Sequence, residues 1–192
     1  MCIRDRSRWR DLTWLSWAGA TAYLLHNVEE YGVDLFGRAY AFPTEMCGLF
    51  GFQDLAACPV PPEFFTAVNV PMFWIGAPLA ALLSRRHPLV GLAIYSVTSV
   101  NLVAHVVGGA ITGTIYNPGW LTALALFLPL TSWTAHVVLG GKRLSGSAMI
   151  YLAGWGVALH LILLGSLFPL MTGLVKSSVP SIGVQVLNAA LL

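Results

Sequence analysis

Charged side chains are scarce in this sequence. They make up 9% of the 192 residues, and no acidic residue follows Glu63. A soluble globular domain carries about 25% charged residues, so this composition excludes an ordinary soluble fold. The net charge of +2 is too small to form a dense basic surface, which excludes nucleic acid as a partner.

Several motifs of soluble enzymes and transporters are also absent. The sequence contains no P-loop, no nucleotide-binding glycine fingerprint, no nucleophile elbow and no paired CxxC. It also shows no internal repeat of the kind found in inverted-repeat transporters. Functions that depend on these motifs are therefore set aside.

Long apolar runs dominate what remains. Hydrophobic residues make up 57% of the chain, and the mean hydropathy is +0.74. Since a membrane-crossing helix needs about 20 apolar residues, we predict an all-α, polytopic transmembrane helical bundle of about five spans. It forms a single domain over residues 11–178, and residues 179–192 are predicted to be a half-helix or a surface segment. The predicted spans cover residues 11–33, 62–83, 88–113, 118–140 and 147–175, with an external loop over residues 34–61.

Residues 1–10 are interpreted as a leader to the first span. The opening "MCIRDR" resembles translated sequencing-adaptor sequence, so residues 1–6 receive no weight. Arg8 and Arg10 precede an apolar stretch, as in a secretory signal. However, "LTWLSW" is short and hydrophobicity resumes beyond it, so we predict that this segment is retained as a span.

Basic residues indicate the orientation of the bundle. Eight of the ten occur before the first span, at Arg85 and Arg86 and at Lys142 and Arg143, in regions that lie on one side of a five-span chain. The positive-inside rule places this side and the N-terminus in the cytoplasm, with the C-terminus outside. The external loop contains Cys47 and Cys58, which are compatible with a disulfide or with two free thiols.

Polar side chains within the spans are predicted to share one layer. At about 1.5 Å of rise per residue, His26 lies about 22 Å along the first span, and the glutamates Glu29 and Glu30 lie about 5 Å higher. Asn101 and His105 come about 18 and 24 Å along the outward-running third span. These depths coincide in the outer half of the membrane.

A cation is the expected partner of this layer. An ionised carboxylate is costly inside a membrane, and no Lys or Arg lies nearby to neutralise Glu29 and Glu30. A proton or a divalent metal would do so, and histidine with carboxylate suits zinc, iron or manganese. We predict that His26, Glu29 or Glu30, and His105 are the metal ligands, and that the other glutamate acts as a catalytic general base.

Other polar residues are predicted to support or surround this layer. The alternative is structural: the glutamates lie among the lipid headgroups, and the histidines hydrogen-bond between helices. "YNPG" at residues 116–119 is predicted to be a tight turn between two spans. The residues predicted to bind substrate or to support the ligands are Asn69, Asn101, Tyr116 and His160.

The motifs "HNVEE", at residues 26–30, and "YNPG", together with His105, resemble a known family. They match the HXXEE-motif family of bacterial integral membrane proteins over about residues 15–140. This resemblance implies a bacterial cytoplasmic membrane location and supports His26, Glu29, Glu30, His105 and Tyr116 as site residues. The family has no established function, so the resemblance implies no reaction.

Three functions follow as expectations from the sequence. The first is a metal-dependent membrane enzyme, a hydrolase or an oxidase, that acts on a lipid-like or small apolar substrate. The second is a proton- or cation-coupled transporter or channel, and the third is a structural or interaction protein. Membrane lipid is the expected partner, and the sequence indicates no protein partner.

Overall fold

The computed structural model describes residues 8–192, so the adaptor-like residues 1–6, including Cys2, lie outside it. Within the described part the chain is a helical bundle without strands, apart from one isolated bridge between Val33 and Ala39. The predicted all-α fold is confirmed. The elements are α2 (Leu12–Asn27), η1 (Val28–Gly32), α3 (Ala41–Leu49), η2 (Leu55–Ala57), α4 (Pro62–Asn69), η3 (Val70–Gly76), α5 (Ala77–Leu83), α6 (Pro88–Thr112), α7 (Trp120–Thr122), η4 (Ala123–Phe127), α8 (Leu128–Gly140), α9 (Gly146–Met171) and α10 (Val179–Ala189).

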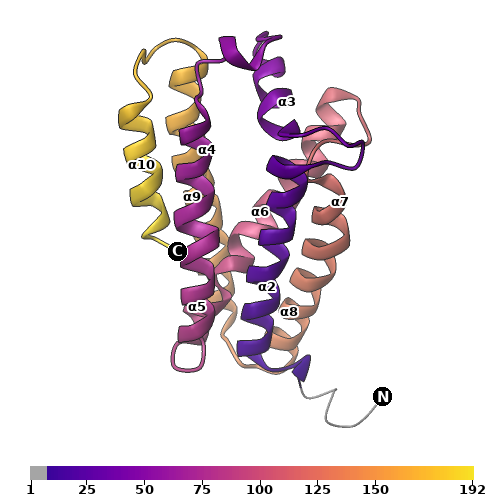
Figure 1. The fold of residues 1–192 in the computed structure, drawn as a ribbon. Coiled ribbons are helices and arrows are strands. Elements are labelled where there is room, and N and C mark those ends of the chain that lie inside the picture. The colour runs from indigo at the N-terminus through magenta and orange to yellow at the C-terminus, as the bar shows by residue number, and fades with distance from the viewer. Residues whose placement is uncertain (1–7) are drawn as a thin grey trace.

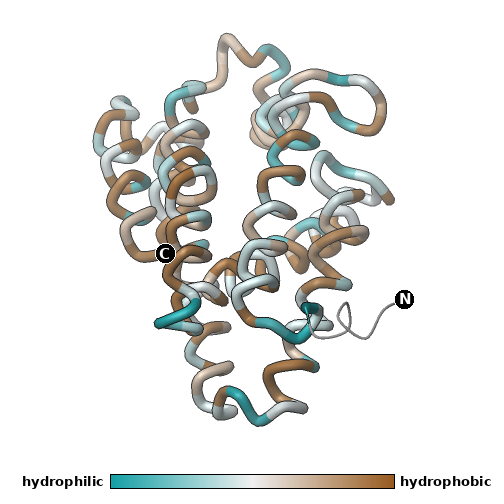
Figure 2. Tube along the Cα trace, turned by 60° about the horizontal axis from the view of Figure 1, so that its bottom comes forward, coloured by the Kyte–Doolittle hydropathy of each residue, from teal (hydrophilic) through white to brown (hydrophobic). Residues whose placement is uncertain are grey.

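Four helical runs are long and apolar enough to cross a membrane: Pro62–Leu83, Pro88–Thr112, Trp120–Gly140 and Gly146–Met171. The run formed by α2 and η1 lies beside them, and its hydropathy is lowered by the polar end of the HNVEE motif. The protein is therefore a multi-pass membrane protein, for which about five spans are plausible. In Figure 2 the hydrophilic colour lies mostly in loops and at helix ends.

Helix α6 lies at the centre of the bundle. It contacts α2, α5, α8 and α9, and Figure 1 shows α4, α9 and α10 grouped on one side of it, with α2 and α8 on the other. Two glycines allow close packing on α6: a Cβ on Gly19 would lie 2.8 Å from Ile94, and one on Gly156 would overlap the backbone of Ser96. The α6 and α9 helices therefore cross closely near Ser96.

The fifth predicted span ends earlier than its hydropathy suggests. Helix α9 stops at Met171, and Gly173 adopts a left-handed φ of +70°, which ends the helix before the predicted boundary at residue 175. The chain then turns back as α10, which packs on α4 and α9, and the indole of Trp155 donates a hydrogen bond to the carbonyl of Leu191 at 3.0 Å. The segment 179–192 thus contains a short helix that lies against the bundle.

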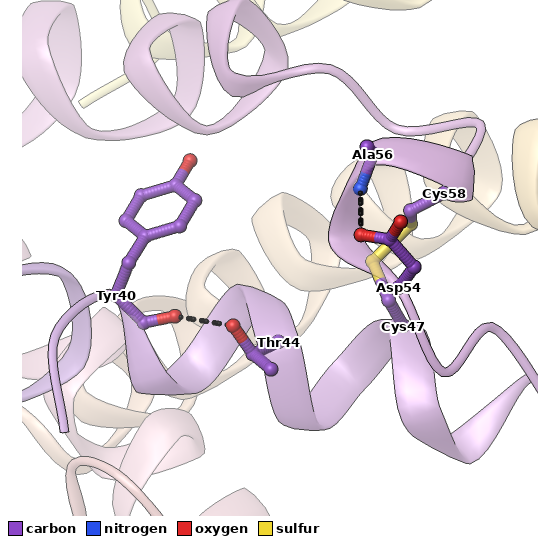
Figure 3. Close-up of a disulfide and its surroundings, with 6 residues drawn as sticks. All are labelled: Tyr40, Thr44, Cys47, Asp54, Ala56 and Cys58. Atoms are coloured by element: carbon purple, nitrogen blue, oxygen red, sulfur yellow. Dashed lines mark hydrogen bonds between the residues drawn. A yellow bond between two sulfur atoms is a disulfide. The ribbon is translucent and has the colours of Figure 1, made fainter.

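The loop between the first two membrane runs is folded. Its helix α3 is tied by a disulfide between Cys47 and Cys58, drawn in Figure 3. Figure 3 also shows the Asp54 carboxylate accepting a hydrogen bond from the Ala56 amide at 2.9 Å. Cys47 is fully buried and packs with Phe64 and Leu170. The disulfide therefore fixes α3 over one end of the bundle.

Candidate metal centre

Three side chains from two helical runs converge in the interior. His26 and Glu30 come from the α2–η1 run, and His105 comes from α6. The Glu30 Oε1 atom lies 3.4 Å from His26 Nε2 and 3.3 Å from His105 Nε2. All three residues are buried, and their candidate ligand atoms lie within 4.8 Å of one another. This group has the composition and spacing to bind a metal ion.

Asn117 fixes the orientation of the His105 ring. The Asn117 amide nitrogen donates to the His105 carbonyl at 2.9 Å, so its Oδ1 atom faces His105 Nδ1, at 2.5 Å. Because an amide oxygen only accepts hydrogen bonds, Nδ1 of His105 carries the proton. Neutral His105 therefore presents the lone pair of Nε2 to Glu30.

Thr122 fixes the His26 ring in the same way. The Thr122 hydroxyl donates its proton to Glu29 Oε2, at 2.5 Å, and lies 2.8 Å from His26 Nδ1. The hydroxyl must then accept from Nδ1, so the lone pair of neutral His26 is on Nε2. This Nε2 atom is buried and has no hydrogen-bond donor. When both rings are neutral, the two imidazoles and the carboxylate thus direct acceptor atoms at a common point.

Glu29 lies outside this group, although the sequence predicts it as a ligand or a base. Its carboxylate accepts from the hydroxyl of Tyr116 at 3.1 Å and from the amides of Leu121 and Thr122 at 3.2 and 2.8 Å. The amides belong to the first turn of the Trp120–Gly140 helical run, where the helix dipole favours an anion. Glu29 is therefore stabilised by a helix N-terminus and reaches the site only through Thr122.

The wide helical turn at Val28–Gly32 accounts for the different directions of the two glutamates. Its closing hydrogen bond runs from the Val33 amide to the Val28 carbonyl, five residues back, at 2.9 Å. Such π-turns widen the helix locally and are frequent at functional sites. Glu30 faces His105 on α6, whereas Glu29 faces α7.

Gly119 closes the site on the side of the YNPG turn. Its φ is +93°, and an added Cβ would lie 2.5 Å from His105 Cε1 and 2.7 Å from His26 Cε1. Only glycine adopts this conformation readily and leaves room for both rings. The backbone of the turn thus packs directly against the two imidazoles.

Tyr116, from the same turn, lies outside the cluster. Its hydroxyl accepts a hydrogen bond from the Leu35 amide at 3.0 Å and donates to Glu29. Burial, together with the nearby negative charge of Glu29, raises the pKa of Tyr116 to about 12. The hydroxyl therefore keeps its proton at neutral pH and remains a donor to Glu29.

A cavity of about 350 Å³ adjoins Glu30 and His105. Of the residues predicted to support the site, Asn69, Asn101 and His160 line this cavity, but their described side-chain hydrogen bonds go to Phe65, Tyr23 and Gly156 and not to the three candidate ligands. Asn69 donates to the Phe65 carbonyl in its own helix at 2.9 Å. These side chains belong to the walls of the cavity.

Three polar residues near the site are missed by the sequence analysis. Asn117 and Thr122 orient the histidines, and Glu45 of α3 lines the cavity. Asn117 stands inside "YNPG", where Asn is expected simply as a turn residue, and Thr122 follows within one helical turn. The only available signal was the position of both beside a motif already singled out.

Comparison with known proteins identifies the family. The sequence model described as "Protein of unknown function with HXXEE motif" matches residues 17–134. Neither a search of curated proteins nor a search of solved structures finds a match. The matched segment covers more than half of the chain and contains His26, Glu30, His105 and the YNPG turn. The chain therefore belongs to the HXXEE-motif family, as its motifs predict.

Proposed function

We propose that His26, Glu30 and His105 bind a divalent transition metal in a membrane enzyme. One observation carries the proposal: two histidine Nε2 atoms and a carboxylate oxygen lie within 4.8 Å of one another in a buried space, and His26 Nε2 has no hydrogen-bond partner there. Buried acceptors without a donor are unfavourable unless a cation joins them. The described part of the chain offers no Lys or Arg partner there, since the only described salt bridges of Glu30 are with the two histidines.

The donor set supports zinc, iron or manganese. Two imidazoles and one carboxylate form catalytic zinc sites and the facial triad of non-haem iron enzymes. Ligand atoms bound at about 2.1 Å to one tetrahedral metal lie about 3.4 Å apart. The separations of 3.4 and 3.3 Å between Glu30 Oε1 and the two histidines agree with this value.

The proposed reaction class rests on the coordination positions that the three protein ligands would leave free beside the cavity. A metal with three protein ligands keeps positions for water or substrate, and when bound it supplies an activated water or an oxidising centre. Glu30 and His105 line the mostly apolar cavity, which supports a lipid-like or small apolar substrate and a hydrolase or oxidase reaction.

Glu45 is a candidate for proton transfer in this cavity. It lies on α3, is partly buried, and its carboxylate is 3.8 Å from the Arg38 guanidinium. Burial raises the pKa of Glu45 despite the attraction of Arg38, so its carboxyl holds a proton more readily than an exposed glutamate does. A carboxyl with a raised pKa suits an acid or a base better than an ordinary exposed carboxyl does.

The location in the cell is also part of this proposal. The positive-inside pattern supports a bacterial cytoplasmic membrane protein with its N-terminus in the cytoplasm and the segment after α9 outside. The metal centre then lies in the outer half of the membrane, and membrane lipid surrounds the bundle.

Metal analysis of detergent-purified protein tests the proposal. We expect about one zinc, iron or manganese ion per chain, and at least a tenfold loss of metal in Glu30→Gln and in His105→Gln. The matched control is His136→Gln, since His136 is exposed and packs beside Trp133 on α8. A chelator should lower the melting temperature of the wild type but not that of Glu30→Gln, because only a bound ligand stabilises the fold.

The same samples separate the alternatives. Metal-free protein with an ion flux that depends on Glu30 would contradict the enzyme proposal and favour a proton- or cation-coupled transporter. If the protein is metal-free, and both ligand variants keep full stability and show no flux, the polar layer has a structural role only.

A further inference from the structure

The cavity beside the metal centre lies in a wedge between two helices. Helices α6 and α9 cross closely at Ser96 and Gly156, and both helices continue beyond this crossing along the walls of the cavity. Residues from α3 cover the end that faces the external loop. The apolar wall positions recur every three or four residues and include Val97, Val100 and Ala104 on α6 and Leu159, Leu163 and Leu167 on α9.

The wedge opens sideways, toward the hydrocarbon of the membrane. Ala104 and Leu164 both line the cavity, yet both are exposed, Leu164 by 54%. They lie within Pro88–Thr112 and Gly146–Met171, seven or eight residues before the end of each helix, and both helices are long and apolar enough to cross a membrane. A surface at this depth faces lipid tails, so these two residues bring the cavity wall to the lipid-facing surface.

A polar group with an open acceptor lies in the α9 and α10 wall. The Asn188 amide nitrogen donates to the Leu159 carbonyl at 3.2 Å and to Gln185 Oε1 at 3.3 Å. These two bonds use both N–H groups of the Asn188 amide, so its Oδ1 atom is the acceptor that remains available. Asn188 is 3% exposed and lines the cavity, and its Oδ1 has no hydrogen-bond partner.

Two more acceptors line the same cavity. Asn101 Oδ1 is buried without a partner. The Nδ1 atom of His160 donates to the Gly156 carbonyl at 2.8 Å, which leaves Nε2 of the neutral ring as an acceptor. A ligand that satisfies these atoms must therefore donate hydrogen bonds. These three side chains are uncharged and the cavity wall is mostly apolar, which favours a neutral donor group. The two carboxylates that also line the cavity, Glu30 and Glu45, belong to the candidate metal centre and to α3.

We propose that the cavity binds a neutral long-chain alcohol that enters from the bilayer between α6 and α9. Its hydroxyl donates to Asn188 Oδ1, and its apolar body lies along the α6 and α9 walls toward Glu30 and His105. The binding itself does not need a metal, but the claim that this alcohol is the substrate rests on the proposed function. The volume of about 350 Å³ is within the range of small-molecule sites, about 300 to 1,000 Å³.

Equilibrium binding to the full chain in lipid nanodiscs tests the ligand class. The probes are radiolabelled 1-dodecanol and unlabelled dodecyl methyl ether, which has the same chain but no donor. We expect the alcohol to bind about fivefold more tightly than the ether in the wild type, because one buried hydrogen bond contributes about 1 kcal/mol. Asn188→Leu should abolish this preference and leave ether binding within about twofold.

The lateral entrance is tested on α9. Leu164→Trp should reduce the rate of dodecanol binding at least tenfold, because the larger indole would obstruct the exposed part of the cavity wall. Leu161→Trp is the matched control, since Leu161 is 63% exposed on the same helix and does not line the cavity. It should bind dodecanol at the wild-type rate.

Three results would overturn the inference: equal affinity of the wild type for alcohol and ether, a preference that survives in Asn188→Leu, or equal rates for the two tryptophan variants. The first comparison uses only the wild type, so the proposal can be tested even if a variant fails to fold. Metal content measured on the same samples separates the two proposals. Metal-free protein that prefers the alcohol would contradict only the proposed function, and metal-loaded protein without the preference would contradict only this inference.

Discussion

Gly119 shows how one backbone position sets the geometry of the two histidines. The Gly119→Ala variant should lose at least tenfold in metal affinity although every candidate ligand is present. Its Cβ would lie 2.5 Å from His105 and 2.7 Å from His26, so one ring must move. The measurement is metal content after dialysis against a metal buffer.

Gly113→Ala is the control for backbone strain in this experiment. Gly113 also has a positive φ, +69°, but nothing lies within 4 Å of its Cβ position. Both variants therefore incur the strain of about 1 to 2 kcal/mol of a left-handed alanine, and only Gly119→Ala disturbs the rings. Equal metal contents in the two variants would show that the packing of Gly119 against the rings does not matter.

Thr122 permits a second test at the residue scale, because it orients His26 without being a ligand. Thr122→Val keeps the side-chain shape but removes the hydroxyl that accepts from His26 Nδ1 and donates to Glu29. Such supporting contacts are worth about 10- to 100-fold in metal affinity, so we expect a loss of that size in competition with a chelator. Thr172→Val, at the exposed end of α9, should bind metal like the wild type. Unchanged affinity in Thr122→Val would contradict the proposed orienting role.

The sequence predicts part of this site and misses part for a physical reason. The spacing of His26 and Glu30 follows from helical periodicity, and helix rise alone brings His105 to their depth. The contacts of Asn117 and Thr122 depend on how the loop after α6 folds back. Thr122 is 96 residues from His26 in sequence, and no local pattern encodes that approach. The direction of Glu29 depends on the π-turn, which periodicity at 3.6 residues per turn does not anticipate.

At the scale of elements, the turn between η1 and α3 links the loop to the site. The buried Asp34 carboxylate accepts from the Phe36 amide at 3.0 Å and from the Arg38 amide at 2.8 Å. The Arg38 guanidinium adds an ion pair at 2.7 Å. The turn presents the Leu35 amide to Tyr116, which in turn contacts Glu29. Its stability therefore bears on the position of the YNPG turn.

This turn should be sensitive to acid. Burial alone would raise the pKa of Asp34, but the hydrogen bonds and charge of Arg38 outweigh it and hold the pKa below its ordinary value of 3.8. The stabilisation is therefore complete at pH values above that ordinary value and is lost as the pH falls through the lower pKa of the folded state. Asp34→Asn should cost about 1 to 2 kcal/mol at neutral pH, and its deficit should shrink in strong acid.

Thermal unfolding of the detergent-solubilised protein between pH 7 and pH 3 measures this effect. The exposed Asp54 accepts one hydrogen bond, from the Ala56 amide, so Asp54→Asn is the matched control and should show a smaller deficit at all pH values. A deficit of Asp34→Asn that stays constant down to pH 3 would contradict the assigned role of its charge.

The helices themselves are the most predictable elements, because membrane spans are defined by composition over about 20 residues. Their ends are less predictable. Hydropathy continues past Met171, but the left-handed Gly173 ends α9 there. The return of α10 along α4 and α9 depends on buried polar contacts such as Asn188 with Leu159, which a hydropathy profile does not register.

At the scale of the whole molecule, the two basic loops and the disulfide lie at opposite ends of the bundle. The exposed Arg85, Arg86, Lys142 and Arg143 lie in the loops after α5 and α8, whereas Cys47 and Cys58 lie in the loop at the other end. Disulfides persist in oxidising compartments, and basic loops are retained in the cytoplasm. Both rules support the proposed orientation, in which α3 faces the outside.

Cysteine labelling in intact cells tests this orientation. In a background with Cys2, Cys47 and Cys58 replaced by Ser, a membrane-impermeant maleimide should label Asp54→Cys and Ser177→Cys, whereas Ser147→Cys should react only after lysis. All three positions are exposed, so differences in labelling report the side of the membrane. The reverse pattern would place the disulfide loop in the reducing cytoplasm and the metal centre in the inner half of the membrane. The proposed alcohol would then enter from the inner leaflet, still past the exposed lining residues Ala104 and Leu164.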